Sequence, residues 1–150
     1  MKTALHLARP EDLDRLETLV TACHAETGVA ADPENRRAAL APLLDGSPHG
    51  VAYLAGPARA PVGYVIVSFG WSVEHGGLHG VIADLYVRPP VRGRGIATEI
   101  LLTLPPALAD AGLRELHLSL HQANDQARRL FARAGFAERD GYIELTRQLF

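Results

Sequence analysis

The sequence predicts an α/β (α+β) fold in which a mixed, mostly antiparallel sheet is flanked by helices. Short apolar runs separated by Gly/Pro turns fill the first half of the chain, a pattern typical of antiparallel strands. The second half alternates strand-like and helix-like segments, which indicates mixed pairing. With 150 residues, the chain can bury roughly 70% of its unfolded surface. We therefore expect a single domain, residues 1–150.

Six strands and four helices are expected in order along the chain. A Gly/Pro-rich turn at 56–61 joins two apolar runs and indicates an antiparallel pair. Leu116, Leu118 and Leu120 alternate with polar residues, the period of a strand with one buried face. The expected strands are 3–8, 51–55, 62–69, 81–87, 116–120 and 142–149, and the expected helices are one from Pro10 past Cys23, then 33–44, 97–111 and 124–134.

Proline, glycine and the apolar period set the expected ends of the helices. Pro10 and Pro33 suit the first turn of a helix, and the helix after Pro10 carries its leucines on one side. The Asp-Gly-Ser-Pro run at 45–48 ends the second helix, and Gly135 forms the C-terminal cap of the last one.

Pro105 and Pro106 fall inside the third expected helix. An interior proline removes a backbone donor and clashes with the preceding turn, at a cost of ~3 kcal/mol. We therefore expect a kink or a break near 103–104, with Thr103 as the N-cap of a restarted helix.

The most informative segment is 87–97, which reads Val-Arg-Pro-Pro-Val-Arg-Gly-Arg-Gly-Ile-Ala. It follows an apolar strand and leads into a helix. Gly93 and Gly95 allow a tight turn with exposed N–H groups, and the helix adds the positive end of its dipole. The segment predicts a phosphate-binding loop, to which Arg92 and Arg94 add positive charge.

A second segment, 124–136, narrows the choice of ligand; it reads Asn-Asp-Gln-Ala-Arg-Arg-Leu-Phe-Ala-Arg-Ala-Gly-Phe. Together the two segments resemble the GNAT superfamily of acyl-CoA-dependent N-acetyltransferases. In that family the loop reads Arg/Gln-x-x-Gly-x-Gly/Ala and the later helix reads Asn-x-x-Ala-x-x-Leu-Tyr-x-x-x-Gly-Phe. The residues that match these patterns are Arg92, Gly95, Ala97, Asn124, Ala127, Leu130, Gly135 and Phe136. The resemblance extends from about Leu5 to the C-terminus and is specific from Val81 to Phe136.

The resemblance implies a GNAT-like twisted sheet of six to seven strands and about four helices. It implies transfer of an acetyl group from acetyl-CoA to a primary amine by direct attack in a ternary complex. Main-chain groups of 85–87 would hold pantetheine and polarise the thioester oxygen, the amides of 92–98 would surround the pyrophosphate, and Asn124 would bind the pantetheine arm. The implied cofactor-binding residues are Leu85, Tyr86, Val87, Arg92, Gly93, Arg94, Gly95, Ile96, Ala97, Thr98, Asn124, Ala127 and Phe131.

Asp84 is the leading candidate for a catalytic base because it is an ionisable residue inside the otherwise apolar strand 81–87. In similar GNAT proteins an acidic residue on this strand often serves as the base. Alternatively, Asp84 orders the neighbouring loop or pairs with an arginine. Glu74 or its neighbour His75, in the loop 72–77, could relay protons or attract a cationic amine; alternatively this loop is a solvated hairpin tip.

Phe131 stands where many GNAT proteins have a tyrosine that protonates the departing sulfur. Phenylalanine has no proton to give, so we expect the thiolate to leave with help from water, the helix dipole, or Tyr86 or Tyr142. Alternatively, Phe131 fills apolar space beside Leu130. The missing tyrosine also leaves open a second function, a non-catalytic acyl-CoA-binding sensor or regulatory module.

Two other classes of site fit the sequence poorly. A dinucleotide-binding loop would have a third glycine and an acidic residue after a second strand. The pairs His75/His79 and His117/His121 lack the spacing of a shared metal site, and the sequence has no Cys-x-x-Cys or His-Glu-x-x-His motif. We expect no metal, and His117 or His121 could instead line the acceptor site.

Charge and cysteine content bound the location and the partners. The net charge is −2, and the arginines at 88, 92 and 94 form only a local patch, so no nucleic-acid partner is expected. A single cysteine and the lack of a membrane-length apolar run predict a cytoplasmic protein with no membrane partner. The expected partner is a small-molecule or peptide amine, and an exposed C-terminal strand would allow a homodimer.

Overall fold

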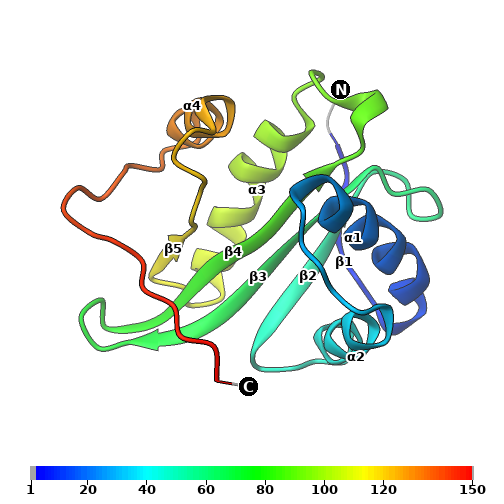
Figure 1. Ribbon diagram of the computed structural model, residues 1–150, viewed down its shortest axis with the longest axis horizontal. Helices are drawn as coiled ribbons and strands as arrows, with labels where there is room; N and C mark the ends of the chain where they lie inside the picture. The colour runs from blue at the N-terminus through cyan, green and yellow to red at the C-terminus, as the bar shows by residue number, and fades with distance from the viewer. Residues whose placement is uncertain (1–2, 150) are drawn as a thin grey trace. The chain divides into compact units, whose positions relative to one another are not determined.

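The computed structural model describes residues 3–149, which form two compact units, one extending to Ser119 and the other beginning at Leu120. The first unit contains the sheet and three helices, and the second contains one helix (Figure 1). The strands are β1 (Leu5–Leu7), β2 (Gly50–Ala55), β3 (Gly63–Ser72), β4 (Gly77–Val87) and β5 (Glu115–His117). The helices are α1 (Leu13–Thr27), α2 (Pro33–Leu44), α3 (Ile96–Asp110) and α4 (Asp125–Arg133), with short 3-10 turns at Pro10–Asp12 and Pro89–Val91.

The strands form one sheet in the order β1-β2-β3-β4-β5. The pairs from β1 to β4 are antiparallel, and β5 lies parallel to β4. The mixed, mostly antiparallel sheet and the four helices are therefore confirmed. The expectation of six to seven strands is wrong, because the described residues contain five.

The missing strand is the expected one at 142–149, which forms neither strand nor helix. Its large apolar side chains, including those of Tyr142, Ile143 and Leu145, are exposed. The apolar residues alone do not make a strand, because each backbone N–H and C=O in a strand needs a hydrogen-bonding neighbour. β5 is also shorter than the expected 116–120.

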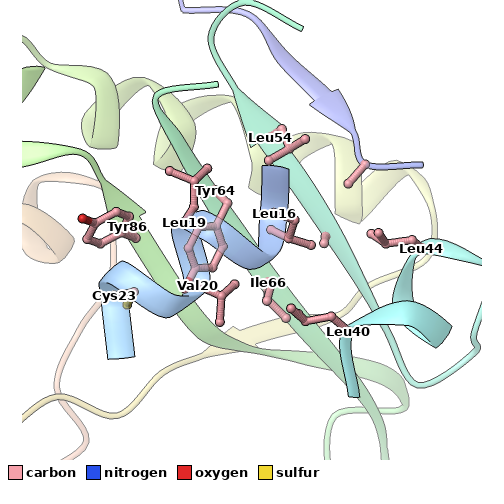
Figure 2. Packing of buried hydrophobic residues seen from close by; sticks show 12 residues of the cluster. Leu16, Leu19, Val20, Cys23, Leu40, Leu44, Leu54, Tyr64, Ile66 and Tyr86 are labelled. Atoms are coloured by element: carbon pink, nitrogen blue, oxygen red, sulfur yellow. The ribbon is translucent and has the colours of Figure 1, made fainter. Parts of the chain in front are cut away.

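The main core lies between the sheet and the pair α1 and α2. Tyr64 and Ile66 of β3 pack there with leucines from both helices, as Figure 2 shows. Successive side chains of a strand point to opposite faces, so Val65 and Val67 are buried on the other face. The leucines of α1 thus fulfil the one-sided pattern that the sequence indicates, and β3 is covered on both faces.

α3 runs unbroken from Ile96 to Asp110 although it contains Pro105 and Pro106. Of the two expected outcomes, the break near 103–104 with Thr103 as a new N-cap is therefore wrong, and the kink stays a prediction. The apolar side chains of Ile100, Leu101, Leu104 and Leu108 on this helix are all buried. The free energy gained by burying these side chains outweighs the cost of the two backbone hydrogen-bond donors that the prolines remove.

Arg92 ties the loop after β4 to α1. Its Nε donates to the carbonyl oxygen of Val87 at 2.8 Å, and its Nη2 donates to Glu26 of α1 at 2.7 Å. The guanidinium carbon also lies 5.4 Å from the centre of the Tyr86 ring, within the range of a cation–π contact. The hydrogen bond from Arg92 lowers the pKa of Glu26. We call these contacts the Arg92 clamp.

Replacing Pro106 with Ala should stabilise the protein. Pro106 is exposed, so the substitution restores a helical N–H donor without opening a cavity. We expect the free energy of unfolding to rise by about 2 kcal/mol, measured by urea denaturation. Pro48→Ala, at an exposed residue outside the helices, is the matched control and should change it by about 0.5 kcal/mol or less. No gain in Pro106→Ala would show that α3 accommodates proline there without strain.

The Arg92 clamp should make stability depend on pH. Because the folded-state pKa of Glu26 lies below its ordinary value of 4.5, the stabilisation is present above that value and is lost as pH falls through the folded-state pKa. The difference in unfolding free energy between the wild type and Glu26→Gln should be fully present near pH 7 and should shrink progressively as the pH falls below 4.5. Urea denaturation at several pH values measures it, with the exposed Glu144→Gln as the control. A difference independent of pH would contradict the clamp.

Candidate functional site

β4 loses its neighbour β5 partway along its length. The two strands pair from His79 opposite Glu115 to Val81 opposite His117, whereas β4 continues to Val87. Beyond Val81, β4 pairs with β3 on one side only among the described strands. Figure 1 shows β4 extending past the short β5. No local pattern in the sequence shows this separation.

A β-bulge interrupts β4 at the start of this free stretch. Asp84 pairs with Ile66 and Ile82 pairs with Val67, which leaves Ala83 without a partner on β3. A bulge bends the strand and increases its local twist, and bulges are common beside active sites. The backbone of β4 therefore changes direction close to the point where β5 ends.

The free edge of β4 presents backbone groups that β3 does not use. Arg88 donates its N–H to the carbonyl oxygen of Val62, so the backbone at Arg88 faces β3. Because this direction alternates along an antiparallel strand, the N–H and C=O of Val87 and Leu85 face the other way. The side-chain hydrogen bond from Arg92 to the Val87 oxygen agrees with that direction. The N–H groups of Leu85 and Val87 and the C=O of Leu85 are thus available to a ligand.

The loop between β4 and α3 exposes a row of amides at the start of a helix. Gly93 and Gly95 both have φ of +80°, which favours glycine, and a Cβ at either would meet nothing within 4 Å. The first helical hydrogen bond runs from the N–H of Glu99 to the oxygen of Gly95. The preceding amides have no acceptor within α3. This geometry, with the dipole of a 15-residue helix, suits an anion.

The two arginines of the loop differ in what they contact. Arg92 is held by the clamp, and its own N–H donates to the oxygen of Pro89 at 3.2 Å. The row of open amides therefore begins at Gly93 and not at Arg92. Arg94 is exposed, so its side chain can reach an anion on the loop.

Asp84 lies under α1 at the end of a polar chain. It accepts a hydrogen bond from the Tyr64 hydroxyl at 3.2 Å, and its Oδ2 is 3.9 Å from Nε2 of His24. His24 in turn accepts a hydrogen bond at Nδ1 from Arg36 of α2 at 3.1 Å. The side chain of Asp84 is 27% exposed, so a ligand can reach it.

Tyr64 and Cys23 complete this chain of polar contacts, and burial raises the pKa of both side chains. Burial and the nearby Asp84 carboxylate raise the pKa of Tyr64, so its hydroxyl stays protonated and donates to Asp84. Burial likewise raises the pKa of the Cys23 thiol, which is hydrogen-bonded to Tyr64. The neutral Tyr64 hydroxyl therefore orients the Asp84 carboxylate through a hydrogen bond and places no second negative charge beside it.

Sequence reasoning missed His24, Tyr64 and Arg36. No local pattern in the sequence marks any of the three as part of the polar chain that ends at Asp84. One weak signal was present, because His24 directly follows Cys23, the last buried residue of the α1 stripe. A residue next to the buried stripe of a helix lies at the border of the core.

The other two residues expected to take part in catalysis have different surroundings. Glu74 is exposed in the turn at 73–76, and its neighbour His75 is the one that contacts Glu115 of β5, at 3.0 Å. Tyr86 is buried in the main core with its ring centre 6.0 Å from that of Tyr64. Tyr86 also lies against Arg92 in the clamp.

Three expected cofactor-binding residues belong to the second unit. Asn124 is the N-cap of α4, and its Oδ1 accepts a hydrogen bond from the N–H of Ala127 at 3.1 Å. Phe131 packs edge-on against Phe136, with ring centres 5.4 Å apart. These contacts support the reading of Phe131 as a packing residue, although Leu130 is not its ring partner. Gly135 has φ of +95° just past the helix end.

Two further properties concern residues 3–149 as a whole. Within this range no group of three or more His, Cys, Asp or Glu residues is arranged to hold a metal ion. None of its helices is both long enough and apolar enough to cross a membrane.

Curated relatives match only part of their own length. An uncharacterised N-acetyltransferase, YycN, from Bacillus subtilis is 36% identical over 67 residues, which is 45% of this chain and 43% of that protein. The N-alpha-acetyltransferase MAK3 of Arabidopsis thaliana is 40% identical over 57 residues, 38% of this chain and 30% of that protein. The matched stretch therefore spans less than half of either relative.

Solved structures match nearly the whole chain. An integron cassette protein from the mobile metagenome of Cole Harbour Salt Marsh has 29% identity and a TM-score of 0.84, over 97% of this chain and 90% of that one. A predicted acetyltransferase from Clostridium acetobutylicum with acetyl-CoA has 18% identity and a TM-score of 0.78, over 96% of each chain. The aminoglycoside N-acetyltransferase AAC(6')-Iy in complex with CoA has 15% identity and a TM-score of 0.82, over 97% and 95%.

The family assignment rests on a match that includes the motifs identified in the sequence. Residues 13–136 match the acetyltransferase (GNAT) family. This range runs from α1 through the free edge of β4 and the glycine loop to Phe136. The chain therefore belongs to the acetyltransferase (GNAT) family.

Proposed function

We propose that this protein transfers the acetyl group of acetyl-CoA to a primary amine, with both substrates bound at once. The observation that carries the proposal is the continuity of the free edge of β4 with the amide row that starts at Gly93. The free edge of β4 offers strand-like hydrogen bonds, and the amide row offers an anion site. Together they suit an extended arm that ends in a diphosphate. Structures of this fold with acetyl-CoA and with CoA support the choice of ligand.

Each part of the site has a separate role in binding coenzyme A. The amides from Gly93 to Thr98 and the Arg94 side chain bind the diphosphate. Leu85 and Val87 bind the pantetheine arm through their backbone groups, as a neighbouring strand would. When bound, acetyl-CoA would supply an activated acyl thioester. Asn124, Ala127 and Phe131, which belong to the second unit, stay predicted cofactor-binding residues on the family resemblance alone.

The proton balance favours a base over an acid. An amine with a pKa near 10.4 costs about 4.6 kcal/mol to deprotonate at pH 7, whereas a thiol with a pKa near 8.5 costs only about 2 kcal/mol to release as thiolate. Asp84 is the proposed base, fixed by the Tyr64 hydroxyl and within reach of solvent. Glu74 and Tyr86 remain secondary candidates, as a proton relay and an acid. The absence of a tyrosine at 131 is compatible with turnover for the same reason.

The acceptor is proposed as a small-molecule or peptide amine. One curated relative is named as an N-alpha-acetyltransferase, and one solved structure as an aminoglycoside N-acetyltransferase. The decisive experiment is thiol release from acetyl-CoA on a panel of primary amines. Release above the hydrolysis rate with at least one amine supports the proposal. Binding of acetyl-CoA without release on any amine would favour a non-catalytic acyl-CoA sensor.

Replacing Gly95 with Glu should abolish acetyl-CoA binding while the protein stays folded. The new carboxylate would face the amide row and repel the diphosphate. Isothermal titration calorimetry with acetyl-CoA should show the heat of binding in the wild type and none in the variant. Gly46→Glu is the matched control, because Gly46 has φ of +76°, open surroundings and a place away from the loop. Equal binding by Gly95→Glu and Gly46→Glu would remove the loop from the cofactor site.

Replacing Asp84 with Asn should lower kcat by about 100-fold, because the amide cannot accept the proton of the acceptor ammonium. The dissociation constant for acetyl-CoA should stay within about twofold, since the loop and the free edge are unchanged. Steady-state kinetics and calorimetry measure the two effects. Asp110→Asn, at the exposed end of α3, is the control for removing a surface carboxylate. Full activity of Asp84→Asn at neutral pH would exclude Asp84 as the base.

A further inference from the structure

Arg36 of α2 determines which nitrogen of His24 carries a proton. Its Nε donates to Nδ1 of His24 at 3.1 Å. Its Nη1 donates to the Thr21 hydroxyl at 3.2 Å and its Nη2 donates to the Ala31 oxygen at 3.3 Å, so the guanidinium is held at three points. A ring nitrogen that accepts a hydrogen bond carries no proton, and arginine only donates. His24 is therefore neutral, with its ring proton on Nε2.

The protonated nitrogen of His24 faces Asp84. Nε2 lies 3.9 Å from Oδ2 of Asp84, which is beyond a direct hydrogen bond but close enough for an ion pair if the ring were charged. A charged ring needs a second proton at Nδ1, where the N–H and the positive charge of Arg36 oppose it. The neutral imidazole thus separates the Arg36 cation from the Asp84 carboxylate and leaves that carboxylate unpaired by either.

The two polar neighbours of Asp84 face the same oxygen. The Tyr64 hydroxyl donates to Oδ2 at 3.2 Å, and Nε2 of His24 is also nearest to Oδ2. Neither neighbour covers Oδ1, and the side chain of Asp84 is 27% exposed. Oδ1 is therefore the oxygen that these contacts leave for an incoming ammonium group.

The other ionisable groups of this region leave the charge of Asp84 in place. Burial raises the pKa of both Cys23 and Tyr64, so these two side chains stay neutral. Glu26, on the same helix as Cys23, is paired with Arg92 in the clamp. The charge balance around Asp84 therefore depends on whether His24 is neutral.

We propose that Arg36 and His24 are positioning residues that keep the negative charge of Asp84 available to the acceptor ammonium. In the proton transfer, an N–H bond of the ammonium breaks and an O–H bond forms at Oδ1 of Asp84. His24 takes no proton in this step, so it is not a relay. This assignment rests on the proposed N-acetyltransferase function and on Asp84 as its base, and it adds the residues that control the base.

A titration of His24 by NMR tests the role of Arg36 in the protein without ligands. Long-range ¹H–¹⁵N spectra distinguish the two neutral forms of histidine from the doubly protonated ring. The His24 signals, among those of seven histidines, are the ones lost in His24→Gln. The wild type should show the Nε2–H form at pH 7.5. Arg36→Met should take the second proton at a pH roughly one unit higher than the wild type, because the cation at Nδ1 is gone.

The activity test asks whether a charged His24 blocks Asp84. With an amine that the wild type acetylates, kcat/KM is measured at pH 8 and pH 6. Relative to the wild type, Arg36→Met should lose about 5-fold more at pH 6, because an ordinary histidine is mostly protonated there and would pair with Asp84. Adding His24→Gln should remove this extra loss, since an amide takes no proton. Arg37→Met, at the exposed neighbouring arginine, is the matched control and should match the wild type at both pH values.

The outcomes separate this role from the proposed function. An Nδ1–H form in the wild type, an unchanged titration in Arg36→Met, or an extra loss at pH 6 that persists with His24→Gln would overturn the positioning role while the N-acetyltransferase function stands. Arg36→Gln, which removes the charge but keeps N–H donors, replaces Arg36→Met if that variant is poorly folded. A wild type that releases thiol with no amine on the panel would overturn the proposed function, and this role with it.

Discussion

The hydrogen-bonded ladder between β3 and β4 is the constraint on which the rest of the structure depends. It runs from Gly63 opposite Val87 to Ser72 opposite Gly77, with one irregularity at Ala83. Because this ladder holds β4 from one side along its length, the other side can lack a partner without fraying. A strand with one satisfied edge and one open edge can accept a ligand as its next neighbour.

Tyr64 connects the packing of the core to the chemistry of the site. Its ring is fully buried between β3 and α1, while its hydroxyl reaches Asp84. A buried tyrosine of this kind supplies apolar contact area and one fixed polar atom. The position of the carboxylate is therefore determined by how α1 packs on the sheet. Arg92 does the same for the loop, since it joins the loop to Glu26 on that helix.

Local chemistry in the sequence was enough to predict many elements and the glycine loop. α2 begins at Pro33 and ends at Leu44 as expected, because proline and the run after Leu44 act within a few residues. The expected break near 103–104 and the expected strand at 142–149 were wrong, because helix continuity depends on distant apolar contacts and a strand depends on a partner. The separation of β4 from β5, the bulge, and the contact of His24 with Asp84 join residues distant in sequence. No local pattern encodes them.

Burial of Cys23 has a practical consequence for experiments on this protein. The only cysteine of the chain sits in the core beside Tyr64, and its raised pKa leaves little of the reactive thiolate. A chromogenic disulfide reagent added to the native protein would therefore report liberated coenzyme A with little background from the protein itself. The same reagent would begin to label the chain once the core opens, so one dye can follow both turnover and loss of native structure.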